Sequence, residues 1–219
     1  MRGIQTTINR TVNESWRKLK RTGEAKLPLQ EELFDPGKHP VQEEERETAV
    51  CFTGHRSLPE KALPELTERL DALLEALYSR GFRRFYCGGA LGFDTLAAQR
   101  VLKLQAARPL TRLILALPCA TQTDGWSDWD RREYQRLKYA ADEVCLLSSF
   151  YYRGCMQVRN RFMVDRSSFC LCYLEKPHRG GTSATVTYAL QQDLPVLNLA
   201  MSDACDHFLA ESAAKPRAD

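Results

Sequence analysis

Small and charged residues follow a short apolar run in a pattern that suits the binding of an anion. Thr53, Gly54, His55 and Arg56 come directly after this run. A glycine turn leaves backbone N–H groups free to donate, and an arginine can hold a phosphate through two parallel hydrogen bonds. This turn therefore predicts contacts to an anionic group.

Two further glycine-rich turns each lead straight into a predicted helix. Glycine lets the backbone approach a ligand, and a helix N-terminus offers N–H donors and a positive dipole end to a phosphate. Each turn alone is a weak signal, but together they favour a nucleotide-like ligand. Asp94 could cap its helix or bind a ribose hydroxyl. The residues of the two turns are Gly88, Gly89, Ala90, Gly92 and Asp94, and then His178, Arg179, Gly180, Gly181 and Thr182.

The fingerprints of several common enzyme classes do not match. The Gly-Gly-x-x-Gly spacing differs from G-x-G-x-x-G, and the P-loop pattern G-x-x-x-x-G-K-[ST] does not occur. The chain also lacks a G-x-S-x-G serine, a Cys-x-x-Cys pair and histidines at zinc-ligand spacing. We therefore expect no NAD-type dehydrogenase, no P-loop NTPase and no serine hydrolase, and we expect no metal site and no resident cofactor.

These turns must be positioned by strands and helices. The apolar pattern predicts alternating strands and helices from residue 49 onward. The predicted strands are almost wholly apolar, which is typical of a parallel sheet covered by helices on both faces. Such sheets bind ligands at the carboxyl ends of their strands, where the glycine turns lie. We predict an α/β, Rossmann-like three-layer sandwich with a mainly parallel sheet of about six strands. The strands are expected at 49–53, 83–87, 110–117, 143–147, 169–174 and 195–199, and the helices at 61–80, 91–107, 129–140, 156–166 and 181–190.

The first 48 residues differ from the rest and predict a charged N-terminal extension. Lys and Arg outnumber Asp and Glu by seven to two over residues 1–27, and the ratio is reversed over residues 28–48. We expect a short amphipathic helix over residues 12–20 and a solvated linker over the acidic residues 43–47. The predicted parts are the extension (1–48, flexible or partly helical), a nucleotide-binding domain (49–205) and a C-terminal tail (206–219).

Composition excludes a disordered, fibrous or membrane-spanning chain. Of 219 residues, 43% are hydrophobic and 27% are charged, with a net charge of +3, and these values are near the averages for globular proteins. No apolar run approaches the ~18 residues of a membrane span, and the first residues lack the apolar core of a secretory signal. The eight cysteines fall mostly in predicted strands, so we expect buried thiols and a cytoplasmic protein without a membrane partner.

The ordered set of motifs from residue 49 to about 200 resembles the YpsA-like branch of the SLOG superfamily, which also contains DprA and the LOG phosphoribohydrolases. The resemblance implies a Rossmann-like fold with a pocket for a nucleotide, a nucleotide-derived signal or a nucleic-acid phosphate. The matching elements are Phe52-Thr-Gly-His-Arg56, Gly88-Gly-Ala-Leu-Gly-Phe-Asp94, Pro118, Gln122, Trp126, Tyr134, Ala141-Asp142, Met156-Gln-Val-Arg159-Asn160, Met163-Val-Asp165-Arg-Ser167, Gly180-Gly-Thr182 and Tyr188-Ala189.

The LOG enzymes of this superfamily cut the base–ribose bond of a nucleoside monophosphate, and the resemblance carries their motifs over only in part. Their arginine corresponds to Arg159, their lysine to Asn160 and their glutamate to Thr187, which cannot act as a carboxylate. If the chain is an enzyme, catalysis falls to Arg159 and Asp94, because an oxocarbenium-like centre needs a carboxylate.

The resemblance therefore implies binding of a nucleotide or nucleotide-derived ligand in a signalling or regulatory role. Two alternatives are a LOG-like nucleoside-phosphate N-glycosidase or transferase, and DprA-like single-stranded DNA binding; a homodimer is compatible with each. Trp126, Trp129, Tyr151 and Tyr152 could stack on bases, but we expect them to pack. The predicted ligand-binding residues are Thr53, Gly54, His55, Arg56, Gly88, Gly89, Ala90, Gly92, Asp94, Arg159, Asn160, Gly180, Gly181 and Thr182.

Overall fold

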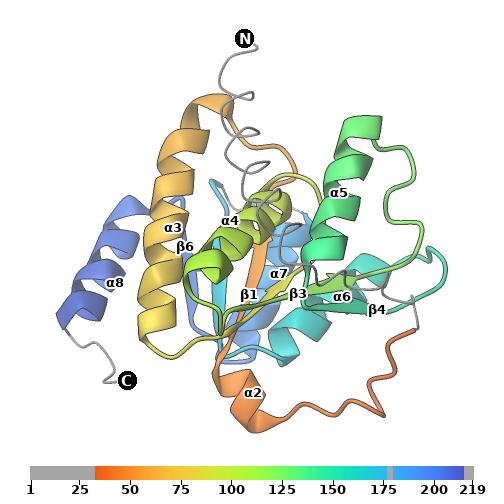
Figure 1. Cartoon of the computed structure of the whole chain (residues 1–219), viewed down its shortest axis with the longest axis horizontal. Coiled ribbons are helices and arrows are strands. Elements are labelled where there is room, and N and C mark those ends of the chain that lie inside the picture. Colours follow the sequence, from red (N-terminus) through yellow and green to blue (C-terminus); the bar gives the residue numbers. More distant parts are fainter. Residues whose placement is uncertain (1–32, 177–179, 215–219) are drawn as a thin grey trace. The chain divides into compact units, whose positions relative to one another are not determined.

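The computed structural model describes residues 33–176 and 180–214, and strands alternate with helices along this part of the chain (Figure 1). The helix predicted over residues 12–20 lies outside it. The strands are β1 (Ala49–Gly54), β2 (Arg84–Cys87), β3 (Arg112–Leu117), β4 (Glu143–Leu146), β5 (Phe169–Tyr173) and β6 (Val196–Asn198). The helices are α2 (Glu43–Glu47), α3 (Leu63–Ser79), α4 (Phe93–Ala107), α5 (Asp128–Ala140), α6 (Cys155–Asp165), α7 (Gly181–Gln191) and α8 (Ser202–Ala214).

All six strands run parallel, in the order β4-β3-β2-β1-β5-β6. From β1 the chain winds outward through β2, β3 and β4, and then crosses back to place β5 on the other side of β1. The direction of winding thus reverses between β1 and β5. A parallel sheet leaves a ligand-binding crevice at the carboxyl ends of its strands at such a point. The predicted Rossmann-like sandwich is confirmed.

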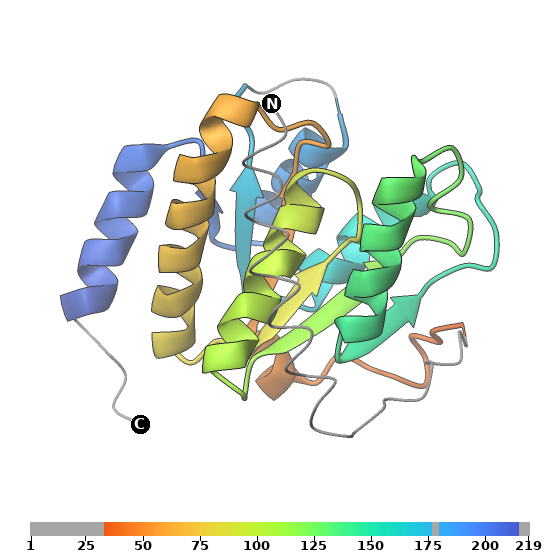
Figure 2. The same cartoon turned by 45° about the horizontal axis from the view of Figure 1, so that its top comes forward.

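Helices cover both faces of the sheet (Figure 2). Strand side chains alternate between the faces, so Val50 and Phe52 of β1 belong to the core on the face that α3, α4, α5 and α8 cover. Cys51, between them, packs on the other face beneath α6 and α7. Because both faces are buried, the strands are apolar throughout rather than alternating in polarity.

Helix α3 shows how the sequence sets these elements. Five leucines recur at helical spacing along it and are all buried, and each contributes about 1.5–3 kcal/mol by leaving water. The helix stops two residues before Gly81, whose φ of 97° favours glycine. The N–H of Phe82 donates to the carbonyl of Leu77 and that of Gly81 to the carbonyl of Tyr78, which closes the last turn.

The cysteines are buried and free of disulfides, as predicted. Cys119 and Cys155, which sequence places in or beside loops, are buried as well. Within residues 33–176 and 180–214, no helix has the length and apolar character needed to cross a membrane.

The stretch expected to be a solvated linker is helical and is tied to the sheet. Glu45 of α2 pairs with Arg84 of β2 at 3.2 Å. Upstream, the N–H of Phe34 donates to the carbonyl of Leu146 at 2.7 Å, and the Phe34 ring meets Phe162 edge-on with ring centres 5.1 Å apart. At the other end, α8 occupies much of the stretch expected to be a tail and packs on α3.

Candidate functional site at the carboxyl edge of the sheet

The three predicted turns meet at the carboxyl ends of β1, β2 and β5. The hydroxyl of Thr182, in the first turn of α7, donates to the carbonyl of Gly54 at 2.9 Å. The N–H of Phe93, which begins α4, donates to the carbonyl of His55 at 3.0 Å. Segments that are far apart in the sequence therefore meet where the winding of the sheet reverses.

Two of the glycines let the β1 and β2 turns touch. Gly92 has a φ of 75°, and a Cβ there would lie 2.5 Å from the carbonyl carbon of Arg56. A Cβ on Gly54 would lie 2.5 Å from the ring of Phe93. Any larger residue at either position would force the two turns apart, so both glycines serve the fold of the site.

Arg159 occupies the centre of the site and is only 5% exposed. Its Nη1 donates to the carbonyl of Gly88 and lies 3.8 Å from Oδ2 of Asp94. Its Nε donates to Oδ1 of Asn160 at 2.7 Å. The guanidinium stands where a Cβ of residue 88 would be, and Asp94 Oδ2 would be 2.6 Å from that Cβ. The structure thus brings together four residues that the sequence predicted.

A chain of polar contacts carries this network into α7. The amide of Asn160 donates to the hydroxyl of Thr185 at 2.6 Å, and that hydroxyl donates to the carbonyl of Gly181 at 2.8 Å. Thr185 is buried and was not among the predicted residues. Its only signal in the sequence is its place one turn after Gly181. The position of Arg159 is therefore linked to the N-terminal turn of α7.

Burial dominates the electrostatics of the Arg159–Asp94 pair. Burial raises the pKa of Asp94 above its ordinary value, although Arg159, the N–H of Ala90 and Arg56 act to lower it. Burial likewise lowers the pKa of Arg159, against the attraction of Asp94. Loss of water thus outweighs mutual attraction in both groups, which is common for buried ion pairs. The exposed Arg56 also lowers the pKa of Arg159, so its charge reaches the site.

Gln122 is a site residue that the predicted binding set omitted. It is buried, and its Nε2 donates to the carbonyls of Gly88 and Gly89 at 3.2 and 2.8 Å. Its Oε1 is buried and has no hydrogen-bond partner among the described residues. A buried acceptor of this kind usually finds a partner in water or a ligand. The signal was present in the sequence as the Pro118-x3-Gln122 spacing.

Of the remaining predicted residues, His55, Gly180 and Gly181 lie on the turns at this edge of the sheet, whereas Thr53 and Ala90 are buried. His55 accepts a hydrogen bond from the N–H of Glu175 at 3.3 Å and meets the ring of Tyr173 edge-on at 5.9 Å. Burial and a hydrogen bond to Glu175 raise the pKa of Tyr173 to about 12. Gly180 and Gly181 are exposed, and a Cβ on Gly181 would meet no described atom within 4 Å. His178 and Arg179 lie outside the described residues.

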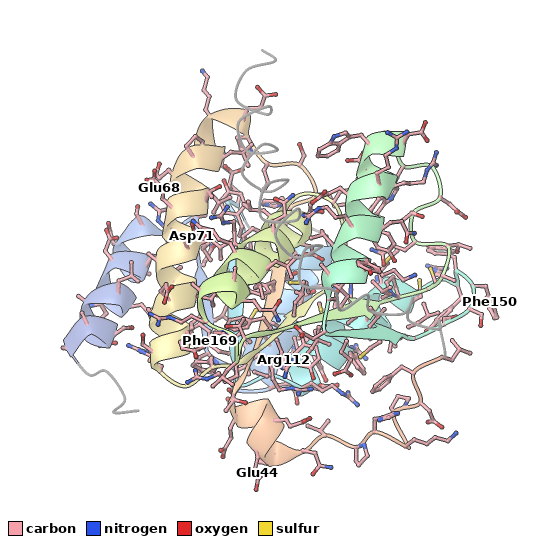
Figure 3. The ribbon with its side chains drawn as sticks, in the orientation of Figure 1. Glu44, Glu68, Asp71, Arg112, Phe150 and Phe169 are labelled. Carbon is pink, nitrogen blue, oxygen red and sulfur yellow. The ribbon has the colours of Figure 1, made fainter. Side chains whose placement is uncertain are left out.

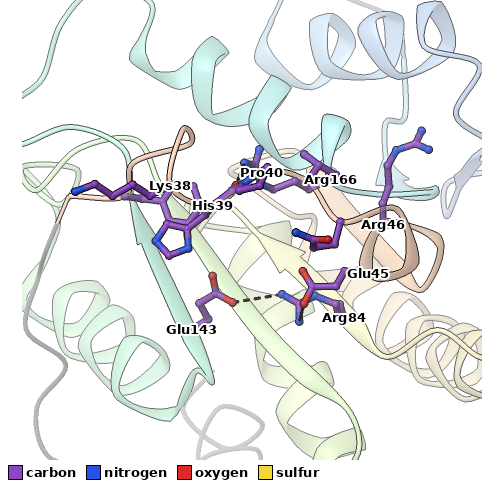
Figure 4. Close-up of a pocket in the computed structure, with 11 residues that line it drawn as sticks. Lys38, His39, Pro40, Glu45, Arg46, Arg84, Glu143 and Arg166 are labelled. Atoms are coloured by element: carbon purple, nitrogen blue, oxygen red, sulfur yellow. Dashed lines mark hydrogen bonds and ion pairs between the residues drawn. The ribbon is translucent and has the colours of Figure 1, made fainter.

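A cavity of about 350 Å³ lies at the opposite edge of the sheet (Figure 4). Side chains from residues 34–46 line one side of it. Arg84 and Glu143, the first residues of β2 and β4, and Arg166 complete the lining. Arg84 pairs there with Glu45 and with Glu143, at 3.2 and 3.4 Å. No glycine turn that leads from a strand into a helix lines this cavity, and Arg84 already makes two ion pairs there, although its Nε has no hydrogen-bond partner among the described residues. The carboxyl edge therefore remains the candidate site.

Comparison with known proteins matches the part of the chain that forms the sheet and the candidate site. A family model described as the YspA SLOG family, with the short name YpsA, matches residues 51–202. The chain therefore belongs to this family, which confirms the resemblance. A UPF0398 protein of Halalkalibacterium halodurans is 30% identical over 125 residues, covering 56% of this chain and 66% of its relative. The prophage-derived protein YoqJ of Bacillus subtilis, described as uncharacterized, is 28% identical over 138 residues, covering 57% of this chain and 80% of its own length.

Two solved structures share the fold. The DNA processing protein A (DprA) of Helicobacter pylori, whose structure is described as revealing a single-stranded DNA binding mode, superimposes with a TM-score of 0.52 and 17% identity. This match covers 78% of this chain and 75% of the other. The DprA of Streptococcus pneumoniae gives 0.51 and 16%, with 75% and 56% covered. At these identities the likeness concerns the fold alone.

Proposed function

We propose that the carboxyl edge of the sheet binds a nucleotide or nucleotide-derived ligand through its phosphate, and that the protein signals or regulates through this binding. The observation that carries the proposal is the burial of Arg159 beneath the turn that follows β2. Its Nη1 and Nε donate to Gly88 and Asn160, which fix the plane of the guanidinium at this edge. A buried guanidinium is suited to an anion that restores the solvation lost on folding.

The helix ends around the crevice support a phosphate as this anion. Helix α7 begins after Gly180 and α4 after Gly92, and a glycine has no side chain with which to cap the first N–H groups of its helix. Such helix ends attract negative charge. The open space beside Gly181 leaves room for a phosphate to approach the backbone closely. The ligand would thus lie between α7 and the Gly88–Gly92 turn, within reach of Arg159.

The rival reaction, cleavage of the base–ribose bond, has less support. Thr187 is exposed on α7 and cannot supply a carboxylate. Asp94 is the buried acid of the site, but its Oδ2 accepts from the N–H of Ala90 at 3.3 Å and pairs with Arg159. It therefore supports the guanidinium and the turn rather than facing a sugar. Release of free base from a bound nucleotide would nevertheless establish the enzyme.

Thermal unfolding of the full chain against nucleoside phosphates, cyclic nucleotides, ADP-ribose, NAD and a short single strand tests the proposal. A ligand at a hundred times its Kd stabilises by about 2.7 kcal/mol. We expect this stabilisation to disappear in Arg159→Gln and to persist in Arg161→Gln, because Arg161 is exposed on the same helix.

Gly181→Ala keeps the test decisive if Arg159→Gln does not fold. It adds a methyl group where the fold has room, and we expect weakened binding in a chain of unchanged stability. A panel in which no compound stabilises the wild type would contradict the proposal. Stabilisation that survives both Arg159→Gln and Gly181→Ala would contradict the site.

A further inference from the structure

Three consecutive aromatic side chains in the loop between β4 and α6 are exposed. Phe150 is 66% exposed, Tyr151 62% and Tyr152 39%. The sequence led us to expect Tyr151 and Tyr152 to pack, and the structure corrects this. Figure 3 shows Phe150 at the outer end of the loop, away from the sheet. Contiguous exposed apolar surface of this kind usually marks a contact with a ligand or partner.

Hydrogen bonds at both ends hold this loop in place. The carbonyl of Ser148 accepts from the N–H of Ala120 at 3.1 Å, which joins the loop to the one that follows β3. The Ser148 hydroxyl donates to the carbonyl of Phe150 at 2.8 Å and accepts from its N–H at 3.3 Å. The N–H of Cys155 donates to the carbonyl of Tyr152 at 3.1 Å. The aromatic rings are thus presented by a fixed backbone, which lowers the entropy lost on binding.

The charge around the loop favours a polyanion. No acidic residue occurs in the sequence between Glu143 and Asp165, and Arg153, which directly follows the aromatic residues, is exposed. A loop that carries an exposed arginine and no acidic residue favours a phosphate backbone over an acidic protein.

The loop lies on the same edge of the sheet as the Arg159 site but at a distance from it. It follows β4, which is two strands from β2, and Arg159 contacts the turn that follows β2; two strand spacings amount to about 10 Å. Helix α6 connects the two, since it starts at the end of this loop and carries Arg159 four residues, or about 6 Å, further on. A mononucleotide held at Arg159 would not extend to Phe150, whereas a strand of several nucleotides would.

We propose that this loop is a base-stacking platform, and that the ligand of the carboxyl edge is a single-stranded nucleic acid with one phosphate at Arg159 and neighbouring bases on Tyr152, Tyr151 and Phe150. The proposal rests on the function proposed above, whose ligand class it narrows. Every base has a face that stacks on an aromatic ring, so the platform binds with little sequence preference. A duplex, whose bases are already stacked, does not use it.

Fluorescence anisotropy with a labelled oligothymidylate, beside calorimetric titration with thymidine monophosphate, tests the platform in the full chain. Alanine at Tyr151 or Tyr152 is expected to lower the affinity for the strand roughly five- to a hundredfold. Binding of the monophosphate stays unchanged in these variants, because its contacts lie at Arg159. Tyr139→Ala is the matched control, since Tyr139 is 44% exposed near the end of α5, at the opposite edge of the sheet.

The possible results distinguish failure of the stacking platform from failure of the phosphate site at Arg159. A strand that binds no more tightly than the monophosphate, or equally well in Tyr151→Ala and Tyr152→Ala, overturns the platform and leaves the Arg159 site standing. Equal binding of a duplex also overturns the platform. Failure of both probes to bind overturns both proposals. Strand binding that Tyr152→Ala weakens and Arg159→Gln does not would contradict both proposals, because each places a phosphate at Arg159.

Discussion

The guanidinium of Arg159 lies against the backbone of Gly88, in the space that the Cβ of any other residue would need. The two residues are 71 positions apart in the sequence, and a hydrogen bond from Nη1 to the Gly88 carbonyl joins them. The absence of a side chain at Gly88 thus makes room for the guanidinium of Arg159, in addition to its role in the turn. Helix α6 and the Gly88 turn therefore form one structural unit, and a change in either alters the site.

Gly88→Ala should destabilise the protein because its methyl group would overlap the Arg159 guanidinium. We expect a loss of about 1–3 kcal/mol in the free energy of unfolding, as for overpacking at other buried positions. Urea unfolding of the purified variant measures it. Gly181→Ala is the matched control, with open space around its Cβ and an expected change close to zero. Equal stability of wild type and Gly88→Ala would show that Arg159 does not occupy this place.

Arg159→Met and Asp94→Asn should prove non-additive. Arg159→Met alone leaves the Asp94 carboxylate buried without its partner, which costs about 3–5 kcal/mol in comparable pairs. The double variant removes both charges, so its loss should be smaller than the sum of the two single losses by at least ~1 kcal/mol. Urea unfolding of the four proteins gives this coupling energy. Strictly additive losses would mean that the two side chains do not interact.

Asp94 should make the protein lose stability as the pH rises. Burial raises its pKa above the ordinary 3.8, so the folded chain keeps the proton where the unfolded chain has released it. The stability that Asp94 contributes is therefore present below pH 3.8 and is lost as the pH rises through the raised pKa. Asp94→Asn mimics the protonated form, so its stability relative to wild type should increase with pH across this window. Thermal unfolding at several pH values measures the difference, and a difference independent of pH would contradict the assignment.

Asp71 should show the opposite pH dependence. Partial burial acts to raise its pKa, but hydrogen bonds from Arg100 at 2.5 and 2.6 Å and from Lys103 at 2.7 Å lower it overall. The stability that Asp71 adds between α3 and α4 is thus present above pH 3.8 and is lost as the pH falls through the lowered pKa. Asp71→Asn should cost about 1–2 kcal/mol at neutral pH and much less near pH 3. A cost that grows on acidification would rule out this ion pair.

The strands and most helices could be predicted because their patterns are local. The five buried leucines of α3 and the glycine that ends it are readable without any tertiary contact. The apolar strands likewise indicated a sheet covered on both faces. Helix α8 was not predicted, because its buried residues, Cys205, Phe208 and Ser212, form only a narrow stripe in a polar segment. Its packing against α3 decides its structure.

The position of the site could be predicted, but not its internal contacts. Glycine turns after parallel strands indicate the edge of the sheet at which a ligand binds, whatever the remaining residues are. The contact between Arg159 and Gly88 depends on how α6 crosses the sheet, and no local sequence pattern indicates this crossing. Thr185 was missed for the same reason, since it becomes a site residue only through its contact with Asn160. Gln122 belonged to the matching motifs, but its role at Gly88 and Gly89 depends on contacts that its motif does not show. Tyr151 and Tyr152 were expected to pack because aromatic residues usually do, and their loop instead holds them in solvent.

A titration of the isotope-labelled full chain with a nucleoside monophosphate, followed by amide and arginine Nε chemical shifts, tests the central claim most directly. We predict shifts at the amides of residues 54–56, 88–92 and 180–183 and at Nε of Arg159, with no change around the cavity at residues 38–46. Shifts confined to that cavity, or no shifts at any concentration, would contradict a phosphate site at the carboxyl edge.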